Sequence, residues 1–356
     1  MASIIDFSNL TFSAEQVRSI ADLIRLERVE AGDFARFHDV HTEIRYNKEI
    51  GFYGEMGLVG KKDLGCDPTA DDAGVDINKK LWTPEQFRIR LKECWKDLDA
   101  TLALYARRTG TDIADLTGTD YLNLVEQLAG EAVQKMLWRT WLMDTDATNV
   151  GDGVGSELIT LGVDTDYFTI IDGFWKQIGV IVAATPSQLT VVAANSEATK
   201  ALQFSQLTPT LAMSYLMNAT YDMPVELVRQ PNKIGMITRY FANQVKKQFQ
   251  TTNTHPDAYQ ATIDGIDVLK VNGIEFAIID DWTEQILAYN DLGLSYHLPH
   301  RAIITTKENL AYGIETASGF AQFNTFFDPV SEYSFINMLD KIDVKVLQDK
   351  LIHVIY

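Results

Sequence analysis

The run Asp144-Thr145-Asp146-Ala147-Thr148 is the first place in the chain where residue types and spacing fit a known chemistry. It matches the DxDxT pattern in which an aspartate attacks a phosphoryl group. That reaction requires the first aspartate at the end of a buried strand, facing a magnesium ion. Here the preceding residues, 136–143, continue a helical pattern. The sequence therefore favours acidic residues in a turn that ends a helix.

The same region matches two other ligand-binding patterns only in part. An EF-hand beginning at Asp144 would need glycine at its sixth position and glutamate at its twelfth, where this chain has Asn149 and Gly155. The Gly-Asp-Gly-Val-Gly run at 151–155 follows a helix and lacks the Lys-Ser/Thr pair of a phosphate-binding loop. We predict a flexible turn over 151–155, with a weaker, irregular cation site as the remaining alternative.

Histidines give no stronger signal. Two pairs stand three residues apart: His38 with His41, and His297 with His300. Neither pair has a nearby cysteine or the HExxH pattern of zinc hydrolases, and Leu298-Pro299 excludes a regular helix between the second pair. A GxSxG nucleophile motif is absent from the sequence. We therefore predict no catalytic, cofactor-binding or metal-binding residue.

Composition excludes several protein classes. The 356 residues carry a formal net charge of −18, so the chain repels phosphate backbones and tight nucleic-acid binding is not expected. Cys66 and Cys94 lie far apart and read as ordinary thiols, since two cysteines build neither a disulfide framework nor a four-ligand zinc site. No apolar run approaches the roughly 20 residues that span a bilayer, and 1–7 lacks the features of a signal peptide. We expect synthesis in the cytoplasm.

The elements that must position these residues follow from apolar periodicity. We expect helices from Ser13 to Gly32 and over 83–108, 120–143, 167–183, 207–221 and 239–250. We expect strands over 233–238, 266–271, 274–279, 302–306, 342–347 and 351–356. Residues 36–82 are rich in glycine and poor in apolar residues, which predicts a long protruding loop or ribbon. Because helices and strands alternate without a βαβ repeat, the expected class is α+β.

Several runs then occur in a distinctive order. Val271-Asn272-Gly273-Ile274-Glu275-Phe276 is followed by Asp280-Asp281-Trp282-Thr283 and by the segment 298–313, which contains Thr305-Thr306-Lys307-Glu308-Asn309-Leu310. Phe326-Phe327-Asp328 leads to the closing strands, and Trp82-Thr83-Pro84 leads to the long helix that ends at Asp144. In this order the runs, which cover most of 80–356, resemble the major capsid proteins of tailed bacteriophages with the Hong Kong 97-type fold.

The resemblance implies a layout for the whole chain. Residues 1–35 would be an N-terminal arm, 36–82 an extended loop, 83–160 a peripheral domain with its spine helix at 120–143, 161–330 an axial domain, and 331–356 strands returning to the peripheral domain. Residues 36–82 are rich in glycine and have little core of their own, which fits a loop that lies across an adjacent subunit. The apolar side chains of such a loop become buried only when the subunits assemble.

The resemblance also implies a function and partners. The protein would be a non-enzymatic capsid component, without a cofactor, that assembles into pentamers and hexamers of an icosahedral head enclosing double-stranded DNA. Its partners would be its own copies, a portal protein, decoration proteins, and packaged DNA through non-specific contact only, with no membrane. Some family members begin with a long coiled-coil scaffold segment. Here only 1–35 precede the loop, so we expect a separate scaffold, or none. Assembly would take place in the host cytoplasm, and the mature location would be the virion.

Two alternatives stay open on the sequence alone. One is the shell protein of a bacterial encapsulating compartment, which would share the fold and enclose protein cargo. The other is a soluble enzyme or ligand-binding protein, which would have a pocket with convergent titratable groups.

Overall fold

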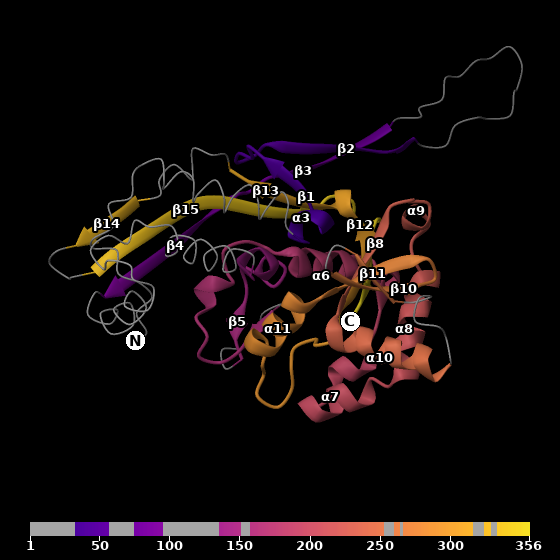
Figure 1. Cartoon of the computed structure of the whole chain (residues 1–356). Helices are drawn as coiled ribbons and strands as arrows, with labels where there is room; N and C mark the ends of the chain where they lie inside the picture. The colour runs from indigo at the N-terminus through magenta and orange to yellow at the C-terminus, as the bar shows by residue number, and fades with distance from the viewer. Residues whose placement is uncertain are drawn as a thin grey trace, which may run out of the picture.

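The computed structural model describes residues 33–56, 75–94, 135–150, 157–252, 260–263, 266–315, 324–328 and 333–356. These residues form two main sheets, one of seven strands and one of five, with helices packed around the larger sheet (Figure 1). Two further sheets have two strands each: β2 (Glu49–Met56) with β3 (Val75–Leu81), and β5 (Thr148–Asn149) with β6 (Leu158–Ile159). The expected α+β class is confirmed.

The seven-stranded sheet has the order β7-β16-β12-β8-β11-β10-β9. Its strands are β7 (Leu189–Thr190), β8 (Lys233–Thr238), β9 (Gln260–Ile263), β10 (Ile266–Val271), β11 (Ile274–Ile279), β12 (Ala302–Thr306) and β16 (His353–Ile355). Successive side chains of a strand point to opposite faces. Met236 accordingly packs in a core with residues of α6 (Phe174–Ala184) and α11 (Asp280–Tyr289), whereas Ile237 packs with α8 (Pro209–Tyr221) and α10 (Arg239–Thr251). Burial on both faces explains why the central strands are continuously apolar.

Two short helices complete this half of the molecule, α7 (Lys200–Gln206) and α9 (Val225–Val228). Local sequence fixes where the neighbouring helices start. Thr199 caps α7 and Thr208 caps α8, each by accepting a hydrogen bond from a backbone N–H three residues later. Pro209 follows Thr208 at the first helical position, where its missing N–H costs nothing.

The five-stranded sheet is built around one long strand, β15 (Tyr333–Val346). The second half of β15 pairs with β13 (Leu310–Ile314), which in turn pairs with β1 (Asp39–Thr42). The first half pairs with β14 (Asn324–Asp328) on one side and with β4 (Glu85–Cys94) on the other. We call β4, β14 and residues 333–340 of β15 the wing, because they extend to the left of the helical body in Figure 1.

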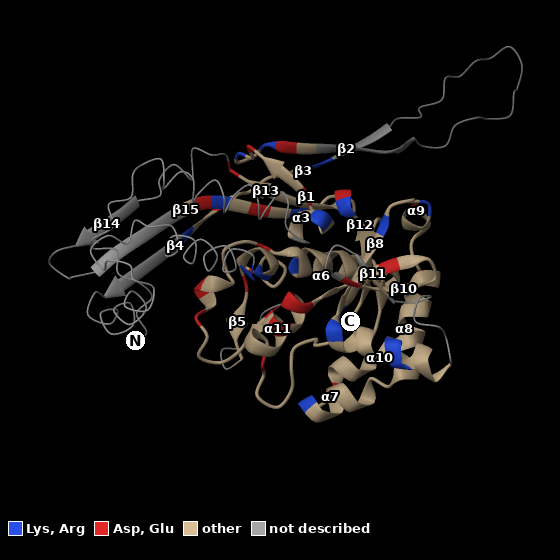
Figure 2. Cartoon of the chain, viewed as in Figure 1, with Lys and Arg blue, Asp and Glu red and all other residues tan. Residues whose placement is uncertain are grey.

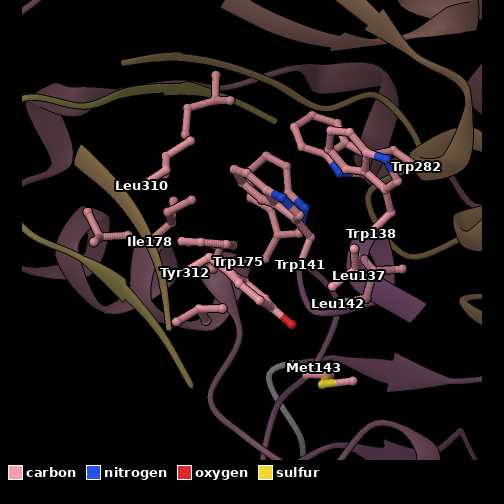
Figure 3. Packing of buried hydrophobic residues seen from close by; sticks show 14 of the residues in the cluster. Leu137, Trp138, Trp141, Leu142, Met143, Trp175, Ile178, Trp282, Leu310 and Tyr312 are labelled. Atoms are coloured by element: carbon pink, nitrogen blue, oxygen red, sulfur yellow. The ribbon is translucent and has the colours of Figure 1, made fainter. Parts of the chain in front are cut away.

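A cluster of aromatic residues joins the two sheets. Trp282 of α11 contacts three other tryptophans, with ring centroids 4.7 Å from Trp141, 5.2 Å from Trp175 and 6.2 Å from Trp138 (Figure 3). Ile342, Val344 and Val346 of β15 belong to the same core. Close packing requires glycine at 173, since a Cβ there would lie 2.6 Å from the backbone oxygen of Met143. The second half of β15, from which the wing extends, is therefore packed in the same core as the helical body.

The β2–β3 pair, which we call the ribbon, is attached at its base. The Trp82 N–H donates to the Lys48 carbonyl and the Asn47 N–H donates to the Trp82 carbonyl, at 3.0 and 2.9 Å. Trp82 is buried with Ile44 and Ala311, and Gly313 leaves the space that the Trp82 ring occupies. The Lys80 ammonium group reaches the Val346 carbonyl oxygen at 2.6 Å and Asp349 at 2.7 Å. The base of the ribbon is thus fixed to the body.

Most of the expected strands and helices after residue 160 are confirmed. Strands occur at all six expected places, as β8, β10, β11, β12, the second half of β15 and β16. The expected helices are present as α6, α8 and α10, although α6 begins only at Phe174. Helices α7, α9 and α11 were not expected.

The helix expected over 83–108 is wrong where the structure describes it, because residues 85–94 form strand β4. Phe87, Ile89 and Leu91 alternate with charged residues, a period of two that fits a strand paired with β15. The expected helix over 120–143 continues only to Arg139 before a turn, and its residues 120–134 lie outside the described part, as do 95–108 and the helix from Ser13.

The residues near two of the expected boundaries also pack in ways that the sequence does not indicate. The range 36–82 was expected to have little core, yet Phe37, His38 and Ile44 are buried and β1 belongs to the five-stranded sheet. The closing segment 331–356 divides between the sheets, with β15 in the smaller sheet and β16 in the larger. The chain passes from the larger sheet to the smaller one in the short turn between β12 and β13. After β15 it returns to the larger sheet, where β16 pairs with β12. The wider division into arm, loop, peripheral and axial domains stays a prediction.

Candidate functional site

Asp144, the first residue of the DxDxT run, is fully buried in the turn that follows the helical residues 135–139. Lys176 of α6 donates to the Asp144 carboxylate at 2.6 Å and also contacts Asp146, and it lies 3.4 Å from Asp172. Burial alone would lower the pKa of Lys176, but hydrogen bonds to Asp144 and Asp146 raise it above its usual value. The lysine ammonium group holds the aspartates together and gives this run a structural role.

The backbone around Asp144 supports the same interpretation. Its two carboxylate oxygens accept hydrogen bonds from the N–H groups of Asp146 and Glu157, at 2.8 and 3.2 Å. Among the residues that the structure describes, no group of three or more His, Cys, Asp and Glu side chains is suited to a metal ion. The Gly-rich run 151–155 lies outside those residues, as does Cys66, whereas Cys94 ends β4.

The first histidine pair is split between different partners. The His38 ring is buried, its Nδ1 lies 2.7 Å from the Phe34 carbonyl oxygen, and its Nε2 accepts from the Trp141 indole N–H at 2.9 Å. Since an indole N–H only donates, Nδ1 carries the proton and the ring is neutral. Burial lowers the pKa of His38 to about 3. His41 lies in β1, 3.1 Å from Asp39.

The second pair is split in the same way. The His300 ring is buried, and its Nε2 lies 3.0 Å from the Gln203 carbonyl oxygen. Burial lowers the pKa of His300 to about 4. His297 lies 3.7 Å from Glu157 on the other side of the loop. The structure therefore brings neither histidine pair together around a shared ligand.

Lowering the pH from 6.5 to about 4 is expected to destabilise unassembled subunits. His38 and His300 have folded-state pKa values of about 3 and about 4, below the unfolded value of 6.5. Between these values the unfolded chain binds more protons, so stability is complete above pH 6.5 and falls as the pH falls, by up to ~1.4 kcal/mol per pH unit for each group. Urea titrations across this range measure the slope, which His300→Gln should reduce. An identical slope in the variant would contradict neutral burial of His300.

A cavity of about 360 Å³ lies between α6 and the loop before β12. Its polar walls include Glu157 and Arg301, whose side chains are almost fully buried and form two hydrogen bonds of 3.0 and 3.2 Å. Arg301 also donates to the carbonyl oxygens of Leu298 and His297 and lies over the Trp175 ring. Because the carboxylate neutralises the guanidinium group and four of its five N–H donors are used, this pair holds the loop. Sequence reasoning missed it, since 144 residues separate the partners.

The ribbon and the wing are the elements that a compact enzyme would not need. In the described part of the chain, β2 and β3 pair only with each other, and β4 pairs only with β15. Charged residues follow one another along the described parts of the ribbon and of β15, whereas α8 carries none (Figure 2). Strand edges outside the body provide backbone donors and acceptors that a second chain can use. The geometry is suited to contacts between subunits.

Comparison with known proteins adds a decisive observation. No family model and no curated protein matches the sequence. Among solved structures, a chain of the satellite phage P4 procapsid aligns over 92% of this chain and 95% of its own length, with 10% identity and a TM-score of 0.50. The chain has the fold of tailed-phage capsid proteins. The expected fold is thereby confirmed, and this similarity extends over both sheets.

Other solved structures align over similar lengths. A chain of Gordonia phage Cozz covers 90% of this chain with 10% identity and a TM-score of 0.49, over 85% of its own length. A chain of an encapsulin complex from Synechococcus elongatus covers 99% of this chain with 11% identity and a TM-score of 0.45, over 95% of its own length. Within the residues described, no helix of this capsid fold is long and apolar enough to cross a membrane.

Proposed function

We propose that this chain is the major capsid protein of a tailed bacteriophage and that its activity is self-assembly, not catalysis. The observation that carries the proposal is the similarity to a chain of the phage P4 procapsid over 92% of the sequence. Two buried ion pairs support the proposal, Asp144 with Lys176 and Glu157 with Arg301. In both pairs the opposite charges neutralise each other, so these polar clusters stabilise the fold.

In this proposal the subunits form pentamers and hexamers of an icosahedral head that encloses double-stranded DNA. The partners are other copies of the chain, a portal protein, a separate scaffold and decoration proteins. The net charge of −18 suits a shell that contacts packaged DNA but does not bind it tightly. Assembly takes place in the host cytoplasm, and the assembled protein resides in the capsid of the virion.

The ribbon supplies the mechanism of assembly in this proposal. Its base is fixed to the body through Trp82 and Lys80, whereas β2 and β3 belong to neither main sheet. When an element of this kind lies on a neighbouring subunit, its exposed surface becomes buried. Association then stabilises both the element and the contact between subunits.

Expression of the chain alone, followed by electron microscopy and size-exclusion chromatography, tests the proposal. Closed shells, tubes or capsomer rings are expected. Shells that enclose protein cargo in place of DNA during infection or in the native host would instead identify an encapsulating compartment. A uniform small oligomer, both alone and with the scaffold gene, would overturn the proposal.

A further inference from the structure

Arg139 is a half-buried cation without a counter-charge in the described part of the chain. It is the last helical residue before the turn that contains Asp144. Its Nε atom is buried and has no hydrogen-bond partner, and no described carboxylate forms an ion pair with it. Two other arginines of the described part pair with carboxylates: the fully buried Arg301 with Glu157, and the partly exposed Arg239 with Asp267 and Asp280. Arg139 therefore differs from Arg301, the buried guanidinium group that has its own carboxylate.

Aromatic rings hold the side chain of Arg139 in place. The guanidinium carbon lies 5.5 Å from the ring centre of Tyr167 and 5.9 Å from that of Phe168. Phe168 is buried, but Tyr167 is 57% exposed, so one wall of this arrangement faces outward. Burial lowers the pKa of Arg139, because the guanidinium group loses part of its hydration. Arginine nevertheless stays charged in proteins.

We propose that Arg139 and the ring of Tyr167 form a contact site that a carboxylate of a second copy of this chain occupies in the assembled shell. The inference rests on the proposed self-assembly. A guanidinium group binds carboxylates with two parallel hydrogen bonds, and pre-positioning by aromatic rings reduces the ordering cost.

Charge favours a protein carboxylate as the occupant. The chain has 49 Asp and Glu residues against 31 Lys and Arg residues, so a second copy presents an excess of carboxylates. A DNA backbone would have to approach past Asp164 and Asp166, which are exposed beside Tyr167. The two aspartates repel a polyanion strongly, whereas they repel a single carboxylate much less, because it carries only one negative charge.

The test compares Arg139→Met with Lys247→Met, a control that removes one positive charge from an exposed position of α10. Subunits are freed of nucleic acid and assembled under the conditions in which the wild type forms shells. Arg139→Met is expected to fold with a urea midpoint no lower than that of the control, because no intramolecular ion pair is lost. Its threshold concentration for assembly is expected to rise at least ~10-fold, while the control stays near the wild type.

The outcomes separate this inference from the proposed function. If the wild type fails to assemble, the proposed function fails. If the wild type and Arg139→Met assemble at the same concentration, the contact site is wrong and the proposed function stands. An Arg139→Met subunit that unfolds, or that loses stability in proportion to its assembly defect, would assign Arg139 a role inside the subunit and overturn the inference.

Discussion

Replacing Glu157 with alanine is expected to lower the free energy of unfolding of the subunit by about 3–5 kcal/mol. The substitution leaves the Arg301 guanidinium group, only 1% exposed, without its carboxylate. It also removes one of the two acceptors of the Asn290 side-chain amide, at 3.2 Å, and leaves the Leu158 carbonyl oxygen as the other. Urea denaturation of unassembled Glu157→Ala subunits measures the change.

Glu275→Ala provides the matched control for this prediction. Glu275 pairs with Lys270 at 2.9 Å, but both side chains are more than 40% exposed. Loss of such a surface pair costs about 1 kcal/mol or less. If Glu157→Ala lost no more stability than Glu275→Ala, water in the adjoining cavity would be hydrating Arg301, and the pair would not hold the loop before β12.

Replacing residues 57–74 with a two-residue Asn-Gly turn is expected to abolish closed shells while leaving the subunit folded. Met56 and Val75 are paired across the ribbon, and a two-residue loop closes an antiparallel pair of this kind. Trp82, Lys80 and the base of the ribbon are retained, so stability should change by less than about 1 kcal/mol. Electron microscopy reports assembly, and circular dichroism with urea titration reports folding.

A Gly/Ser linker of the same length as 57–74 is the control for this replacement. It restores reach but not the side chains, so it should also fail to close shells if the segment contributes specific contacts. Wild-type shells from the Asn-Gly variant would contradict a role for residues 57–74 in the contacts between subunits. Shells from the linker variant alone would show that length, and not sequence, matters.

The strands that can be predicted from the sequence are those that their own apolar residues make recognisable, without reference to a partner strand. Strands β8, β11 and β12 are short, mainly apolar runs between turn residues, and buried side chains lie on both of their faces. β4 was mistaken for a helix because Thr83-Pro84 resembles a helix start. Its alternating pattern becomes decisive only beside β15, some 250 residues further along the chain. Pairing between distant segments is not visible in local periodicity.

Side-chain roles were harder to predict than elements. The histidine pairs were noticed for their spacing, but His38 and His300 serve as buried hydrogen-bonding groups within the core. The Lys176 cluster and the Glu157–Arg301 pair were missed, because each brings together residues from distant elements. The resemblance to capsid proteins rested on ordered runs such as 298–313, which form β12, the turn and β13. In this segment the chain passes from the larger sheet to the smaller one, so the order of the runs follows from the fold.

Electron microscopy of the protein expressed alone, before and after addition of its scaffold, is the most direct test of the proposed self-assembly. Polyhedral shells or rings of five and six subunits are expected. Their walls should place the ribbon of each subunit on its neighbour. A monodisperse small oligomer under both conditions, with the ribbon exposed to solvent, would contradict it.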